Sequence, residues 1–337
     1  MRRVITAFIL AVLLTVNAEP AKLKARERII SVGYSPNMLQ AQALIAQNMA
    51  EEGKDWFASY LPPGVTISWQ GFSSASEVTE SLTNGVTDFA YVEPCSVLSS
   101  HLTKDVGQNL VAVSAGVRGG VALLARAGAD LYTPTSFRNK KIVVSHPGST
   151  QDISLRHWLL GSGTPFGLAK IDSEIIAVPS FHFSSLLQKE AVDAAWAMEP
   201  WVSMMEIQAN ARLIYVPPPR CTLTSVLAAK REYLLDEKNT TERFIQAHND
   251  LTQWIAEHRE EAGRRIVTEL TRQWWRSFPS EVVSRAWPRL VFEATVSPED
   301  FEPYIQAMRM TGHLKKDHKF NDLVYRPRSM PAAGGSR

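Results

Sequence analysis

A short pattern occurs once in each half of the chain and limits what the chain can fold into. An aspartate precedes an apolar run that holds an aromatic residue, and Glu-Pro ends the run, first at residues 88–94 and again at 193–200. The second copy is one residue longer between Asp and Pro. An echo this short can arise by chance. Because the copies lie in separate stretches of alternating strand-like and helix-like sequence, they favour two similar α/β lobes, each a mostly parallel sheet wrapped by helices.

Local patterns predict the elements of these lobes. Gly116–Gly120 is glycine-rich and precedes an apolar run, so we expect the chain to cross between lobes there. Ligands of open α/β sheets bind beyond the carboxyl ends of the strands, so two facing lobes predict a cleft. We expect strands at residues 28–34, 65–69, 88–92, 110–114, 121–125, 141–145, 175–178, 192–198, 213–216 and 225–229. We expect helices at residues 39–49, 73–82 and 150–160, and mostly helix after residue 239.

The first residues predict export. Arg2 and Arg3 precede the apolar run 4–16, and Val-Asn-Ala at residues 16–18 is a small-residue cleavage site. Thirteen helical residues span only ~20 Å, so a permanent transmembrane helix is the weaker alternative. We expect a cleaved signal peptide and an exported protein. The expected domains are a signal peptide (1–18), lobe I (19–117 plus 221–325), lobe II (118–220) and a loose tail (326–337).

The charge balance gives no bulk attraction to nucleic acid or to an acidic membrane. The chain has 36 Lys+Arg and 34 Asp+Glu, and the signal peptide holds two of the arginines and no acid. The mature chain is therefore formally neutral, and we expect no nucleic-acid partner. Two cysteines cannot form a disulfide scaffold. Cys95 and Cys221 form either one bridge or two separate thiols, and the sequence leaves both open.

No catalytic or metal-binding motif is present. The chain has no G-x-S-x-G, no P-loop, no H-E-x-x-H and no C-x-x-C, and its eight histidines are scattered. Glu93 and Glu199 could act as paired carboxylates, or they could bond the backbone at the two strand ends. We expect a non-enzyme without cofactor or metal.

A candidate binding site lies between a predicted strand and helix, at Gly148, Ser149, Thr150 and Gln151. Backbone N–H groups at a helix N-terminus attract anions, so this turn predicts an anion cradle, with N-capping by Ser149 or Thr150 as the simpler alternative. Aromatic side chains at strand ends, including Tyr34, Tyr91 and Trp196, could form the apolar walls. Arg118 could reach an anion in the cleft or could be an exposed hinge residue.

Six segments in order resemble one family, the periplasmic substrate-binding proteins of ABC importers for sulfonates, taurine and nitrate, which includes thiamine-pyrimidine binders. They are Gly33-Tyr34-Ser35, the serine-rich helix start at 73–76, and residues 82–88, 140–150, 192–195 and 199–201. The resemblance spans essentially the whole mature chain. It implies a two-lobed type II periplasmic-binding fold that closes around a small solute and docks on a membrane permease.

The resemblance also implies cleft-lining positions at Tyr34, Ser35, Ser73, Ser74, Tyr91 to Pro94, and Gly148 to Gln151. Two residues depart from the family pattern. Glu93 places a carboxylate where small residues are common, and Met198 stands where many sulfonate binders carry Trp.

We therefore expect a monomeric receptor for a small organic anion or zwitterion. The alternatives are a thiamine-pyrimidine precursor binding protein, a secreted enzyme, and a sensory module on the same fold. The expected ligand-binding residues are Tyr34, Ser35, Ser73, Ser74, Tyr91, Glu93, Arg118, Gly148, Ser149, Thr150, Gln151, Trp196 and Glu199.

Overall fold

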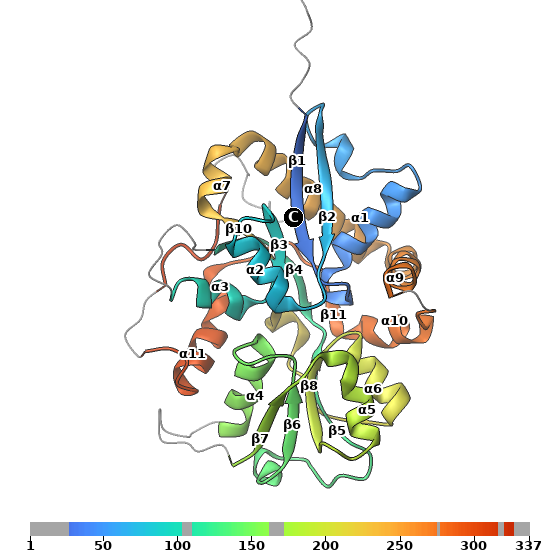
Figure 1. Ribbon diagram of the computed structural model, residues 1–337, viewed down its shortest axis with the longest axis vertical. Coiled ribbons are helices and arrows are strands. Elements are labelled where there is room, and N and C mark those ends of the chain that lie inside the picture. Colours follow the sequence, from blue (N-terminus) through green and yellow to red (C-terminus); the bar gives the residue numbers. More distant parts are fainter. Residues whose placement is uncertain (1–26, 103–109, 162–171, 275–276, 316–319, 327–337) are drawn as a thin grey trace, which may run out of the picture.

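Two β-sheets form the centres of two lobes, and their strand orders match apart from one extra edge strand, β11, in lobe I (Figure 1). The computed structural model describes residues 27–102, 110–161, 172–274, 277–315 and 320–326. The sheet of lobe I has the order β11-β4-β10-β3-β1-β2, and the sheet of lobe II has the order β7-β6-β8-β5-β9. The strands of lobe I are β1 (Arg28–Tyr34), β2 (Val65–Gly71), β3 (Phe89–Val92), β4 (Leu110–Gly119), β10 (Leu223–Lys230) and β11 (Leu290–Val291). Those of lobe II are β5 (Val121–Ala125), β6 (Lys141–Val144), β7 (Glu174–Ala177), β8 (Ala194–Met198) and β9 (Arg212–Tyr215).

Most strands in each sheet run parallel, as the sequence predicts. In lobe I, β1 pairs in parallel with β2 and β3, and β10 runs antiparallel between β3 and β4. In lobe II, β6 pairs in parallel with β7 and β8, and β5 runs antiparallel between β8 and β9. Strands β10 and β5 belong to chain segments that cross between the lobes, and the short edge strand β11 also runs antiparallel to its neighbour β4. The predicted two-lobed α/β fold is therefore confirmed.

Helices cover both faces of each sheet. In lobe I, α1, α8, α9 and α10 enclose one core, and α2, α3 and α11 enclose a second core on the opposite face. In lobe II, α5 and α6 cover one face and α4 covers the other. The helices of lobe I are α1 (Ala41–Glu51), α2 (Ala75–Thr83), α3 (Pro94–Ser100), α7 (Arg231–Asp236), α8 (Lys238–Glu257), α9 (Arg259–Trp274), α10 (Ser280–Ala286) and α11 (Glu302–Met310). Those of lobe II are α4 (Thr150–Leu160), α5 (Phe183–Gln188) and α6 (Trp201–Ala209).

The two copies of the Asp…Glu-Pro pattern occupy equivalent places in the two sheets. The Asp88 carboxylate, just before β3, accepts a hydrogen bond from the backbone N–H of Ser31 on β1 at 2.8 Å. The Asp193 carboxylate, just before β8, accepts one from the backbone N–H of Lys141 on β6 at 2.9 Å. Each aspartate thus fixes the register of the parallel strand beside it, so the repeated sequence pattern corresponds to a repeat in the structure.

The crossing into lobe II involves fewer residues than the glycine-rich segment predicts. Strand β4 continues through Gly116 to Gly119, and only Gly119 and Gly120 adopt positive φ values, of 72° and 69°. A Cβ at Gly119 would collide with the backbone oxygen of Arg289 and with Pro219. Glycine is therefore required at the turn itself, while residues 116–118 belong to a fully buried strand.

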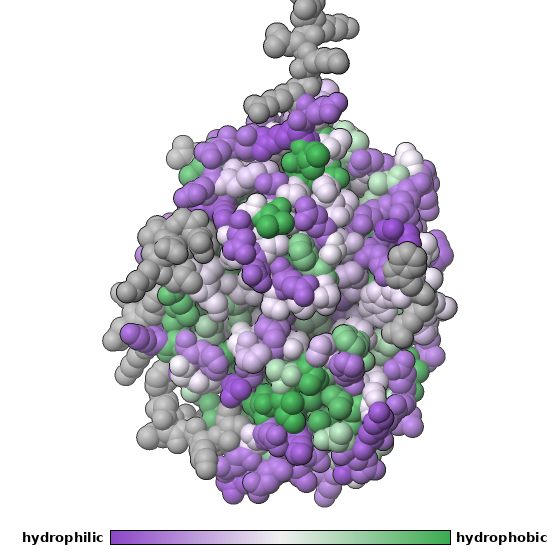
Figure 2. Space-filling model, in the orientation of Figure 1, coloured by the Kyte–Doolittle hydropathy of each residue, from purple (hydrophilic) through white to green (hydrophobic). Residues whose placement is uncertain are grey.

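The remaining expectations concern the cysteines, the termini and the surface. Cys95 is buried and Cys221 is exposed, and both are free thiols, which settles the open choice against a disulfide. The predicted signal peptide and most of the predicted loose tail lie outside the described residues. Within the described ranges, none of the helices combines the length and the apolar character needed to cross a membrane. Figure 2 shows a mostly hydrophilic face on lobe I and a hydrophobic patch over lobe II.

Candidate functional site

The predicted anion cradle at the start of α4 is occupied by carboxylates of the chain itself. Ser149 is the N-cap and accepts the backbone N–H of Asp152 at 3.1 Å. The N–H of Gly148 donates to the Asp152 carboxylate at 2.9 Å, and that of Thr150 donates to Glu93 Oε2 at 2.8 Å. A helix N-terminus whose donors already hold two carboxylates offers little to an external anion. The structure therefore corrects the expectation of an open cradle.

Glu93 reaches α4 from the other lobe. It follows β3 in lobe I, is only 5% exposed, and holds the first turn of a lobe II helix. Its second oxygen, Oε1, is buried and has no hydrogen-bond partner among the described residues. Beside it, Thr150 Oγ1 accepts the backbone N–H of Cys95 at 3.2 Å. Glu93 and Thr150 thus form one of the polar contacts that join the two lobes.

Glu199, the equivalent residue of the second repeat, joins the lobes in the opposite direction. It follows β8 in lobe II, is fully buried, and accepts Arg289 Nε of lobe I at 2.6 Å and the backbone N–H of Ser203 at 3.0 Å. Burial raises the pKa of Glu199, although Arg289 and Ser203 partly oppose that shift. Arg289 also pairs with Glu206 at 2.9 Å. Both Glu-Pro glutamates therefore bond across the lobe boundary, which fits the structural alternative better than acid–base work.

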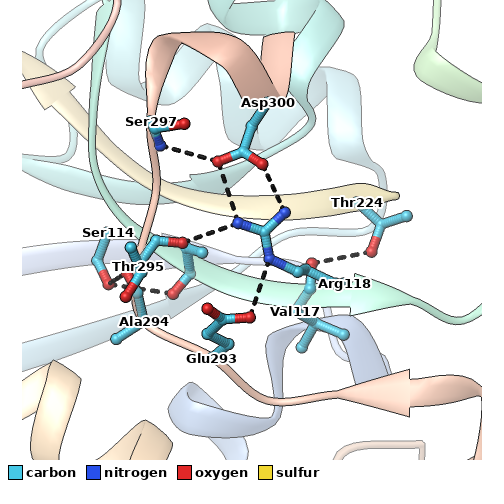
Figure 3. Close-up of polar contacts among 10 residues, drawn as sticks. Ser114, Val117, Arg118, Thr224, Glu293, Ala294, Thr295, Ser297 and Asp300 are labelled. Atoms are coloured by element: carbon cyan, nitrogen blue, oxygen red, sulfur yellow. Dashed lines mark hydrogen bonds and ion pairs between the residues drawn. The ribbon is translucent and has the colours of Figure 1, made fainter. Parts of the chain in front are cut away.

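Arg118 is bound within the molecule (Figure 3). Its guanidinium donates to both carboxylate oxygens of Asp300, at 2.7 and 3.0 Å, and to the backbone oxygen of Thr295 at 3.0 Å, with Glu293 3.4 Å away. Burial alone would raise the pKa of Asp300, but the hydrogen bonds from Arg118 and Ser297 outweigh it and hold that pKa below its ordinary value. Arg118 is only 6% exposed, so it is neither an exposed hinge residue nor a free anion receptor.

Four further predicted residues have hydrogen-bond partners within their own lobe, and a fifth is buried in the core. Tyr34 is buried, and its hydroxyl donates to Gln47 at 3.1 Å, while the Ser35 backbone N–H donates to Gln40 at 2.5 Å. The other three lie in a helix cap and in the core. Ser74 caps α2 and Ser73 bonds Glu77 of the same helix, whereas Tyr91 is buried against His248 with its hydroxyl lacking a partner among the described residues.

A cavity of about 750 Å³ lies where the two lobes and the chain crossings meet. Three of the predicted residues, Thr150, Gln151 and Trp196, line it. On the lobe II side, the cavity is lined by helix α4 and strands β8 and β9. On the lobe I side, it is lined by α11 and the start of β10, and residues 217–222 close the cavity between the two lobes. Helices α4 and α11 pack against each other beside it (Figure 1). This cavity is the candidate functional site.

Three aromatic rings form one wall of the cavity. Tyr215 lies between Trp158 and Trp196, with ring centroids 6.0 and 5.9 Å apart. Tyr304 of α11 lines the cavity as well, and burial, with smaller effects of Cys95 and Glu93, raises its pKa well above the ordinary value. None of the described lining residues is an aspartate, glutamate, lysine or arginine. Neutral polar groups and aromatic faces are what the site offers a ligand.

Sequence reasoning missed most of this wall. Trp158, Tyr215 and Tyr304 were not singled out, although one signal was present in α4. Thr150, Gln151, Ser154, His157 and Trp158 recur at spacings of three and four, which places them on one helix face. Among the described residues, no group of three or more His, Cys, Asp or Glu side chains is arranged to hold a metal ion.

Solved structures share this fold at low sequence identity. The alkanesulfonate-binding protein SsuA from Xanthomonas axonopodis pv. citri, bound to MOPS, matches with a TM-score of 0.68 and 17% identity, over 87% of this chain and 96% of that one. The nitrate-binding protein NrtA from Synechocystis PCC 6803 matches with 0.66 and 16%, over 86% and 83%. A zinc-bound ligand-binding component of an ABC-type import system from Staphylococcus aureus matches with 0.69 and 15%, over 88% and 96%.

The sequence itself gives one family match. None of the curated protein sequences compared matches this chain. A family model does match, over residues 24–271, which include the two sheets' parallel strands, both lobe crossings and the cavity-lining residues of α4. This chain belongs to the NMT1-like family.

Proposed function

We propose that this protein is an extracytoplasmic solute receptor of an ABC importer, which binds a small organic solute between its lobes and delivers it to a membrane permease. The structures with the same fold are binding proteins for sulfonates and nitrate and a zinc-bound component of an import system. The observation that carries the proposal is the interlobe cavity, because a solute held there touches both lobes and stabilises their closed arrangement.

Export is part of the proposal. Residues 1–18 act as a cleaved signal peptide, so that the receptor works outside the cytoplasm. A preference for an anion or a zwitterion is not part of it, because the N–H groups of Gly148 and Thr150 already donate to Asp152 and Glu93.

The test is to express the full chain in a Gram-negative host, purify the protein from the periplasm, unfold it and identify the released small molecules by mass spectrometry. We expect a mature chain that begins at Glu19 and a solute that, added back at 100 times its Kd, stabilises the protein by ~2.7 kcal/mol. The variant Ser154→Phe, which fills part of the cavity, is purified in the same way and should release much less solute than the wild type.

A folded protein that releases no solute would contradict the proposal if alkanesulfonates, taurine, nitrate, phosphonates and thiamine pyrimidines also left its Tm unchanged. A solute that is recovered chemically altered after incubation would instead support the secreted enzyme.

A further inference from the structure

We propose that the cavity takes an uncharged aromatic solute and that Glu93 excludes anions of the same size from it. This inference rests on the proposed function and adds to it the chemical class of the solute. Three observations lead to it: the occupied helix N-terminus, the unpaired carboxylate behind the cavity wall, and the uncharged aromatic lining.

Glu93 sits where an anionic group would otherwise bind. Its Oε2 accepts the N–H of Thr150, a cavity-lining residue, and Asp152 accepts the N–H of Gly148. The partial positive charge of a helix N-terminus is about half a unit, so the carboxylate of Glu93 alone, which has no ion-pair partner among the described residues, more than balances it. An external anion would have to displace Glu93 and leave that carboxylate buried without its donor.

The charge of Glu93 also has no cation beside it. Glu93 forms no ion pair with any described residue, and its Oε1 is buried without a hydrogen bond. Arg118 on β4 and Arg156 on α4 each have a carboxylate partner elsewhere, since Arg118 pairs with Asp300 and Arg156 pairs with Asp152, each at 2.7 Å. An anion in the cavity would therefore face a fixed like charge in a medium of low effective dielectric.

A cationic solute would gain little attraction from Glu93, because Glu93 does not line the cavity and Thr150 lies between Glu93 and the solute. Burying a charge without a direct partner is costly, whichever its sign. Burial lowers the pKa of His157, the imidazole of the lining, and so favours its neutral form. The lining as a whole thus disfavours both signs of charge.

The cavity can recognise a solute through its aromatic rings and its neutral hydrogen-bonding groups. Trp158, Tyr215 and Trp196 form a continuous aromatic wall, with centroid separations typical of favourable ring contacts. Gln151 and Gln306 supply amide donors and acceptors from opposite lobes. A planar ring with an uncharged polar substituent is the solute chemistry that satisfies both.

The experiment uses three probes of nearly equal shape and different charge at pH 7: benzamide, which is neutral, benzoate, which is an anion, and benzamidine, which is a cation. Their affinities for the mature wild-type protein are measured by tryptophan fluorescence and by the shift of Tm. We expect benzamide to bind at least about tenfold more tightly than either charged probe. Equal or tighter binding of benzoate or benzamidine overturns the inference, and so does the absence of binding by all three.

Two variants and one control variant test the role of Glu93 and the location of the binding site. Glu93→Gln removes the negative charge, keeps an acceptor for Thr150 N–H, and should raise the affinity for benzoate by about tenfold with little change for benzamide. Ser154→Phe should abolish benzamide binding, whereas Ser99→Phe, on an exposed position of α3, should not. Unchanged benzoate affinity in Glu93→Gln refutes the role of Glu93. Benzamide binding that survives in Ser154→Phe refutes the location.

Different results test the proposed function and this inference. If the solute released from the periplasmic protein is an anion, the receptor function stands and the inference is overturned. If no solute is released and the panel of solutes has no effect, the receptor function itself fails, whatever the benzamide series shows.

Discussion

Replacing Arg118 with methionine tests whether the Arg118–Asp300 pair holds the C-terminal segment in place. Arg118 lies on β4, directly before the Gly119–Gly120 crossing. Asp300 lies in the short 3-10 helix Pro298–Phe301 that leads into α11, which forms part of the lobe I side of the cavity. The Arg118→Met variant keeps an unbranched side chain of similar length and removes all the guanidinium hydrogen bonds. Asp300 then keeps only the donor of Ser297 among its described partners.

The cost follows from burial. The side chains of Arg118 and Asp300 are 7% and 18% exposed, and removing one partner of a buried ion pair costs about 3–5 kcal/mol. The residual exposure of Asp300 places the expectation at the lower end, about 3 kcal/mol. With an unfolding entropy of roughly 2.1 cal/mol/K per residue, this corresponds to a decrease in Tm of about 4–5 °C for a chain of this length.

The assay is urea unfolding of the wild type, Arg118→Met, Asp300→Leu and the double variant. Because the two residues are in direct contact, the single changes should not add, and the double variant should cost clearly less than their sum. The effect should also depend on pH. The pKa of Asp300 is lowered in the folded state, so the contribution of the pair is present above the unfolded value of about 3.9 and is lost as pH falls through the folded value.

A loss below about 0.5 kcal/mol for Arg118→Met, or simple additivity in the double variant, would refute this reasoning. A small loss would mean that bulk water solvates Asp300 at little cost once the guanidinium is removed, and simple additivity would mean that the two side chains do not stabilise each other.

Three other results are expected. Burial raises the pKa of Cys95 to about 12, so a thiol reagent such as DTNB should label Cys221 and leave Cys95 unlabelled until the protein unfolds; equal labelling rates would contradict the buried position. Thr150→Ala removes the acceptor of the Cys95 N–H and should lower the unfolding free energy by about 1 kcal/mol, whereas Thr150→Ser should not, as urea titration can show. Because burial raises the pKa of Glu199, its favourable contribution is present below about pH 4.3 and is lost as pH rises through the folded value. Glu199→Gln should therefore be least stable relative to the wild type near pH 4, and a difference that grows toward pH 8 would contradict this sign.

The secondary-structure elements and the division into two lobes could be predicted from local sequence alone. The β-rich runs and the three-and-four spacing of apolar residues lead to strands and helices close to those observed, since both are local signals. The repeated Asp…Glu-Pro pattern was sufficient to infer two similar sheets, because each aspartate serves the same neighbouring strand. Capping of α2 by Ser74 and of α4 by Ser149 was also readable locally.

Which of the predicted groups are free to bind a ligand depends on contacts between segments that are distant in the chain. Nothing in the local sequence of α4 shows that Glu93, from the other lobe, occupies its N-terminus, or that Asp300, far along the chain, engages Arg118. Likewise, Tyr215 and Tyr304 reach the cavity through strand pairing and through the packing of α11 on α4. The sequence specifies which chemical groups a side chain carries. Whether its hydrogen-bonding and charged groups are available to a ligand depends on the partners that distant segments of the chain place beside them.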